Sequence, residues 1–241
     1  MKIPASRLAL SALLLTSLLV SARAEETLWS LDFKNLKPGE APTAAPFSAP
    51  SSSPQRVMTD AENTLAGAKA VGPLTSPLLF DKESTSHYLP ALFLKGTTPI
   101  TSGVITVNFD LVFDHINASA EHPVETLMAF PFINGDGGST FILVVASQGG
   151  SSLVLGGAGL KKGKTPVSFK PGEVGHIKAV LDLNAHSFQA FLNDVPMADP
   201  EVDEKKFVSF LGFTLRDGTA LGGNQGATFS AGIGNLVITK S

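Results

Sequence analysis

Six polar residues are the best candidates for a binding site in this sequence, because they alternate with apolar residues along three segments. The six are Asn108, Asp110, His176, Lys178, Asp182 and Gln189. Successive side chains of a β-strand point to opposite faces, so each segment would present these residues on one face. Amide, carboxylate, imidazole and ammonium groups on one surface can donate hydrogen bonds to a polar ligand and accept them from it. The alternative, that the six simply line a solvated strand face, stays open.

The other reactive side chains form no recognisable catalytic or metal-binding motif. The five histidines are His87, His115, His122, His176 and His186, and no pair has the i, i+4 spacing of a helical zinc motif. Without cysteine there is no thiol nucleophile and no cysteine-based zinc site. The glycine-rich segment 134–138 contains a single acid, Asp136, which favours a hairpin turn over a calcium site. We therefore predict no catalytic residues, no metal site and no cofactor, with calcium possible in principle but unsupported.

The first 24 residues have the features of a secretory signal peptide. Lys2 and Arg7 precede an apolar run from Leu8 to Val20, and Ala22-Arg23-Ala24 offers a cleavage site with small residues. The run has about 13 residues, fewer than the ~20 that a membrane-spanning helix needs. We expect an exported protein, periplasmic or extracellular, with no membrane span.

The charge of the remaining chain argues against a nucleic-acid partner. The whole sequence has 18 basic and 21 acidic residues, and the signal segment holds Lys2, Arg7 and Arg23 but no acid. Subtracting those three leaves 15 basic against 21 acidic residues, a net charge of −6. Proteins that bind phosphate backbones carry a basic surface, so nucleic acid is not expected as a partner.

Residues 25–241 are expected to form one domain that is held together by its apolar core. This segment has 217 residues and no cysteine, so disulfides cannot substitute for a core. Five prolines between Pro38 and Pro54 exclude a helix or a central strand there. We expect a surface loop over residues 37–55 that returns to the same domain.

Short apolar runs separated by Gly, Pro, Asn and Asp predict an all-β fold. The expected strands are 27–33, 56–59, 68–71, 89–94, 103–114, 124–132, 140–147, 152–155, 167–169, 175–183, 187–193, 207–215 and 227–239. No segment after the signal peptide shows a sustained helical period, although one helical turn is expected at 199–206. Many short strands with regular spacing indicate a β-sandwich or a barrel.

The clearest strand signals lie in the segments that carry the six polar residues. From Ile105 to Phe113, five apolar residues occupy alternate positions, and a register slip of one residue would bury Asn108 and Asp110. The segment 173–197 predicts a β-hairpin, with one turn at 184–186 and a second turn at Asn193-Asp194.

Three segments fit sequence patterns of a known superfamily. Residues 31–42 contain D-F-x-x-L-x-x-G-x-x-P. The hairpin resembles W-H-x-V-x-V, with Gly175 at the Trp position and Asn193-Asp194 in place of a later Asn-Gly. Residues 232–238 resemble x-I-D-N-V-x-V, with Gly234 in place of Asp. These segments resemble secreted bacterial domains of the concanavalin A-like lectin/glucanase (LamG-like) superfamily. The resemblance implies a jelly-roll β-sandwich of two antiparallel sheets, one of them concave.

Members of this superfamily either bind polysaccharides or cleave them, and the residues for cleavage are missing here. Its laminarinase-like hydrolases carry Glu-x-Asp-x-x-Glu, to which Glu201–Glu204 is the nearest match, without the final Glu. Its alginate-lyase-like members use an Arg-rich strand, a Gln/His strand and a late Tyr. After residue 24 the only arginines in the sequence are Arg56 and Arg216, and the only tyrosine is Tyr88. Its one tryptophan, Trp29, is expected to pack within a sheet.

The favoured function is therefore a secreted, non-catalytic module that binds extracellular carbohydrate on the concave face through the six polar residues. Two alternatives stay open. One is a divergent polysaccharide hydrolase or lyase. The other is a protein-interaction or envelope structural component.

Overall fold

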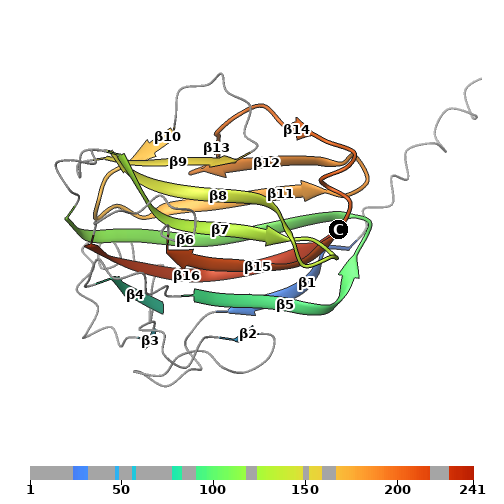
Figure 1. The fold of residues 1–241 in the computed structure, drawn as a ribbon, viewed down its shortest axis with the longest axis horizontal. Coiled ribbons are helices and arrows are strands. Elements are labelled where there is room, and N and C mark those ends of the chain that lie inside the picture. The colour runs from blue at the N-terminus through green and yellow to red at the C-terminus, as the bar shows by residue number, and fades with distance from the viewer. Residues whose placement is uncertain are drawn as a thin grey trace, which may run out of the picture.

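The computed structural model describes residues 24–31, 47–48, 56–57, 78–82, 91–117, 124–148, 152–158, 167–217 and 228–241. These residues form strands, turns and short connections, and no helix occurs among them (Figure 1). The all-β class predicted from the sequence is confirmed. The expected strand 68–71, most of the segment 37–55, and residues 1–23 lie outside the described part of the chain.

The strands form two sheets, and every strand pair in them is antiparallel. The nine-stranded sheet consists of β1 (Glu26–Leu31), β3 (Arg56–Val57), β4 (Leu78–Lys82), β6 (Val104–Asn117), β11 (Gly175–Asp182), β12 (Ser187–Leu192), β13 (Val195–Pro196), β14 (Glu201–Val202) and β16 (Thr228–Lys240). The seven-stranded sheet consists of β2 (Phe47–Ser48), β5 (Ala91–Ile100), β7 (Val124–Ile133), β8 (Ser139–Gln148), β9 (Ser152–Ala158), β10 (Val167–Phe169) and β15 (Phe210–Asp217).

The order of the strands places the predicted hairpin beside the longest strand. In the nine-stranded sheet the order is β13-β12-β11-β6-β16-β4-β3, with β1 on β16 and β14 on β12. In the seven-stranded sheet the order is β10-β9-β8-β7-β15-β5-β2. The second strand of the hairpin, β12, therefore lies near the edge of the sheet, where the two short strands β13 and β14 pair with it on its outer side.

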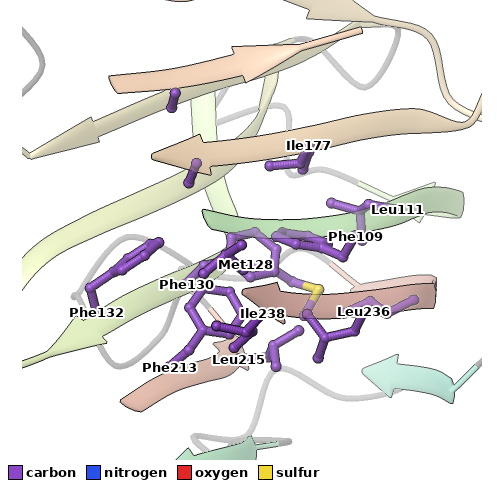
Figure 2. Close-up of a cluster of buried hydrophobic side chains, with 14 of the residues drawn as sticks. Phe109, Leu111, Met128, Phe130, Phe132, Ile177, Phe213, Leu215, Leu236 and Ile238 are labelled. Carbon is purple, nitrogen blue, oxygen red and sulfur yellow. The ribbon is translucent and has the colours of Figure 1, made fainter. Parts of the chain in front are cut away.

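The apolar core lies between the two sheets and is rich in phenylalanine (Figure 2). The Phe109 ring of β6 lies 5.0 Å from that of Phe130 on β7 and 5.8 Å from that of Phe213 on β15, measured between ring centroids. Such spacings are favourable for aromatic pairs. On β6 the five alternate residues from Ile105 to Phe113 are 0% exposed, as the period-two pattern predicted.

The hairpin also has the predicted register and turns. Ile177 of β11 is paired with Phe109 of β6 on one side and with Leu192 of β12 on the other, and all three are buried. Asn193 and Asp194 both have positive φ, 50° and 63°, which two-residue hairpin turns of type I′ require. This register determines which side chains of the hairpin point away from the core.

The segment 199–206 differs from the expectation of a helical turn. Its first part forms the short strand β14, in which Val202 is paired with Ser187 of β12. The second part is a single turn, where the Phe207 amide donates to the Asp203 carbonyl at 3.2 Å. One such bond does not offset the entropic cost of starting a helix, and pairing with β12 takes the preceding residues.

The structure explains why glycine stands at position 175. A Cβ at Gly175 would lie 3.0 Å from Leu192 Cδ1 and 3.2 Å from Phe169 Cε2, so the ring of Phe169 on β10 fills the space that a large side chain would need. Trp29 packs against the core, with its ring 6.0 Å from that of Phe210. The predicted packing role of Trp29 is confirmed.

Candidate functional site

The outward sides of β6, β11 and β12 form one continuous surface, which we call the hairpin face. Cross-strand pairing places Asp110 opposite His176, and Asn108 opposite Lys178. Gln189 is paired with Val180 in the next row of the same face. Directly opposed residues in antiparallel strands have Cβ atoms about 4.5–5.5 Å apart. The hairpin face therefore carries all six polar residues, with Asp182 in the row nearest the first turn.

Asp110 is a buried carboxylate that joins two exposed residues of this surface, His176 and Asn235. Its side chain is almost completely covered, since the residue is 6% exposed. One carboxylate oxygen, Oδ1, lies 2.7 Å from His176 Nδ1, and the other, Oδ2, accepts from Asn235 Nδ2 at 2.7 Å. Both donors compensate the burial of the carboxylate, which would otherwise be costly.

The geometry of this network fixes the hydrogen-bonding roles of His176. An ionised carboxylate can only accept hydrogen bonds, so Nδ1 carries the proton that points to Asp110. In the neutral ring the other nitrogen, Nε2, is then an acceptor, on a side chain that is 46% exposed. The main chain is held as well, because the His176 amide donates to Asn193 Oδ1 at 2.8 Å and the Asn193 amide donates to the His176 carbonyl at 2.8 Å.

Two of the six residues are engaged in local structure. Asp182 Oδ1 accepts from the amides of Asn184 and Ala185, both at 2.9 Å, and so closes the first turn of the hairpin. Gln189 Nε2 lies 3.5 Å from the Ala198 carbonyl oxygen, which is the outer limit for a hydrogen bond. The sequence predicted the face on which Asp182 and Gln189 lie, but not these local contacts of their side chains.

Lys178 and Asn108 occupy the row next to the Asp110–His176 pair. Lys178 Nζ lies 5.7 Å from the centroid of the Phe191 ring on β12, within range of a cation–π interaction. Phe191 is half-buried and faces outward, in contrast to the core phenylalanines. This row therefore combines an ammonium group, an amide and an aromatic ring.

Asn235 is the one member of the Asp110 network that the six predicted residues did not include. It has a φ of 51° and lies at an irregularity of the register between Gly234 and Val237 of β16. Such a β-bulge redirects a side chain. The sequence signal was the Gly234-Asn235 step inside a strand pattern, which is typical of a bulge.

The segment 134–138 is a turn, as the sequence favoured. The Asn134 amide donates to the Gly138 carbonyl at 2.9 Å, and Gly137 has a φ of 86°. Asp136 Oδ1 accepts from the Gly138 amide at 2.7 Å, so this carboxylate serves the turn. In the described part of the chain, no three His, Asp or Glu side chains are placed to hold a metal ion together. The same residues contain no helical segment with the length and apolarity that crossing a bilayer requires.

Segment 201–204 is the best sequence match to the hydrolase motif, and its acids Glu201 and Asp203 contact a lysine or close a turn. Glu201 Oε1 lies 3.1 Å from Lys206 Nζ, and Asp203 Oδ1 accepts from the amides of Lys205 and Lys206. They lie at the edge of the nine-stranded sheet, beside β12. Arg56 and Arg216 belong to different sheets, because β3 and β15 do.

Comparison with known proteins shows the fold. No profile of a known protein family matches the chain, and no curated protein sequence matches it. The structure is similar to a sialidase, with a TM-score of 0.52 and 11% identity over 81% of this chain, but this is only 17% of the sialidase. It is also similar to the alginate lyase AlgAT5 from Polysaccharide Lyase family 7, with a TM-score of 0.52, 15% identity, and coverage of 90% of this chain and 94% of the lyase. The fold is thus a concanavalin A-like jelly-roll β-sandwich of two antiparallel sheets, as predicted.

Proposed function

We propose that this chain is an exported, non-catalytic module that binds extracellular carbohydrate on the hairpin face. The observation that carries the proposal is the buried Asp110 carboxylate, which holds the exposed ring of His176 from one side. The similarity of the fold to proteins named as a sialidase and an alginate lyase supports a carbohydrate ligand. The features of a signal peptide and the resemblance to secreted LamG-like domains support export.

The hairpin face has the groups that recognition of a sugar needs. His176 Nε2 can accept from one hydroxyl group, while Lys178 Nζ and the Asn108 amide can donate to neighbouring oxygens. Residues two apart on a strand are about 6.8 Å apart, so His176 and Lys178 can contact different groups of one ligand. The Phe191 ring adds an apolar surface beside Lys178.

The absence of cleavage residues from the sequence supports the non-catalytic part of the proposal. Beyond the predicted signal peptide there are two arginines, Arg56 and Arg216, and their strands lie in different sheets. No strand can therefore combine them into the Arg-rich strand of an alginate-lyase-like site. The ion pair of Glu201 with Lys206 argues against a free pair of carboxylates at 201–204.

A glycan array probed with the protein, expressed from the full chain, tests the proposal. We expect binding to at least one plant, algal or bacterial polysaccharide, and the array should be run with and without calcium. His176→Ala should then lower the affinity at least tenfold, which corresponds to about 1.4 kcal/mol. Lys205→Ala is the matched control, because Lys205 is exposed in the turn that follows β14. Binding to no glycan on the array would contradict the proposal and favour a protein-interaction or envelope structural component.

A divergent polysaccharide hydrolase or lyase is the second candidate. The pairing of His176 with Asp110 favours it, since a histidine oriented by a carboxylate can act as a general base. Incubation with neutral and uronate-containing polysaccharides tests it, with ultraviolet absorbance reporting unsaturated products and a reducing-end assay reporting hydrolysis. Cleavage that His176→Ala abolishes would replace the binding proposal, whereas no cleavage by a protein that binds glycans would support it.

A further inference from the structure

We infer that Asn235 is a positioning residue of the hairpin face: it acts through Asp110 to hold His176 with Nε2 directed to solvent as a hydrogen-bond acceptor. The ligand part of this inference rests on the proposed carbohydrate-binding function, whereas the orientation of the ring does not. Three neighbouring strands contribute, since β16, β6 and β11 lie side by side (Figure 1).

The backbone of β16 is shaped to bring the Asn235 side chain to Asp110. Gly234 is paired with Asp110, and regular pairing resumes only with Val237 opposite Asn108. Asn235 lies within this irregularity with a φ of 51°, a conformation that side-chain-bearing residues rarely adopt. Asparagine is among the few residues that tolerate it, and such strained positions cluster at functional sites. In this conformation Asn235 Nδ2 donates to Asp110 Oδ2 at 2.7 Å.

The bond from Asn235 restricts what the carboxylate of Asp110 can do. Asn235 donates to Oδ2, while the ring of His176 contacts Oδ1, at 2.7 Å from Nδ1. Each oxygen of the buried carboxylate thus has a side-chain partner, and both partners belong to exposed residues. Loss of the Asn235 amide leaves a buried oxygen without its donor, and the carboxylate can turn to satisfy it elsewhere. The ring of His176 would then lose its fixed orientation and its single tautomer.

This arrangement also defines the chemistry of the ligand. An acceptor at His176 Nε2 requires a donor, which a sugar hydroxyl supplies. Lys178 in the adjacent position and Asn108 opposite it supply donors, which require oxygens. The structure therefore fits a ligand with neighbouring hydroxyl groups, one donating to His176 and the next accepting from Lys178.

Two glycine substitutions separate positioning from structure. Asn235→Gly keeps a residue that favours positive φ and removes the amide that contacts Asp110. Asp194→Gly is the matched control, because Asp194 also has a positive φ, 63°, and is exposed in the second turn of the hairpin. Asn235→Asp is a second variant, which keeps the shape of the side chain and removes the donor.

The first measurement is the tautomer of His176 without ligand, by long-range nitrogen–proton NMR at a pH alkaline enough to keep the ring neutral. We expect a single Nδ1-protonated ring in the natural protein and in Asp194→Gly, and a mixture of tautomers in Asn235→Gly and Asn235→Asp. The second measurement is affinity for the glycan found on the array, which should fall at least fivefold in both Asn235 variants and less than twofold in Asp194→Gly.

The outcomes separate this inference from the proposed function. An unchanged tautomer in both Asn235 variants overturns the inference even if glycans bind. A protein that binds no glycan contradicts the proposed function, while the tautomer measurement still decides the role of Asn235. If Asn235→Asp unfolds through repulsion from Asp110, Asn235→Gly alone decides. An unchanged affinity in a folded Asn235→Gly overturns the role in ligand binding.

Discussion

The outward faces of the two sheets differ in what they could offer a ligand. On the hairpin face of β6, β11 and β12 the outward residues are mostly polar and half-buried, and His176 is exposed. On β7 and β15 the outward positions lie between core residues and include Ala129, Pro131 and Thr214, all of them buried. Thr214 is 1% exposed between Phe213 and Leu215. One face is thus polar and accessible, and the described centre of the other is small, largely apolar and covered.

The difference can be traced to the sequence patterns of the strands. Residues 104–114 alternate apolar and polar residues, which is typical of a strand with one solvated face. Residues 127–132 are apolar without interruption, which is typical of a strand that is buried on both faces. Among the described residues, a site built from polar side chains therefore has its best position on the hairpin face.

A charge introduced on each outward face gives the largest expected effect. Ala129→Asp places a carboxylate at a position that is 0% exposed, with no partner provided for it. We expect a loss of about 3–5 kcal/mol in the free energy of unfolding, or failure to fold. Asn108→Asp is the control on the hairpin face, opposite Lys178, and should change the stability by about 0.5 kcal/mol or less. Urea unfolding measures both, and equal losses would mean that the two faces do not differ.

The next largest loss of stability is expected for substitution of Asp110, at the centre of the hairpin face. Asp110→Ala leaves His176 Nδ1 and Asn235 Nδ2 without their acceptor, which should cost about 1–3 kcal/mol of stability. His176→Ala removes a half-exposed ring and leaves Asp110 its bond to Asn235, so it should cost less than Asp110→Ala. Urea unfolding of both variants checks the order. The reverse order would show that His176, rather than Asp110, is the structural residue.

The contents of the hairpin face were predicted better than its connections. Alternation over Ile105–Phe113 and over the hairpin was enough to assign each residue to a face, because side-chain direction in a strand has a strict period of two. The contact of Asp110 with His176 joins residues 66 apart, and its partner on the other side is 125 residues away. Pairing between distant strands has no local sequence signal. Asn235 was missed for the same reason, and because a bulge breaks the alternation that the prediction relies on.

A gain of stability is expected on the covered face. The Oγ1 atom of Thr214 is buried and has no hydrogen-bond partner among the described residues. Thr214→Val replaces the hydroxyl by a methyl group of similar shape, so it should stabilise the protein by about 1 kcal/mol. Thr106→Val on the hairpin face is the control, since Thr106 is only half-buried, and its effect should be smaller. Thermal unfolding of both variants measures the difference. A less stable Thr214→Val would indicate that the hydroxyl group has a partner after all.

The smallest effects distinguish residues that serve the hairpin from those that are available to a ligand. Asp182 closes the first turn with two bonds of 2.9 Å, so Asp182→Ala should cost about 0.5–1 kcal/mol. Gln189 has one contact of 3.5 Å to Ala198, so Gln189→Ala should change the stability by less than about 0.5 kcal/mol. Urea unfolding at high precision, with Lys205→Ala as the reference for an exposed position, measures both. If Gln189→Ala costs as much as Asp182→Ala, then Gln189 anchors the chain after β13, and the residues left for a ligand narrow to the rows of His176 and Lys178.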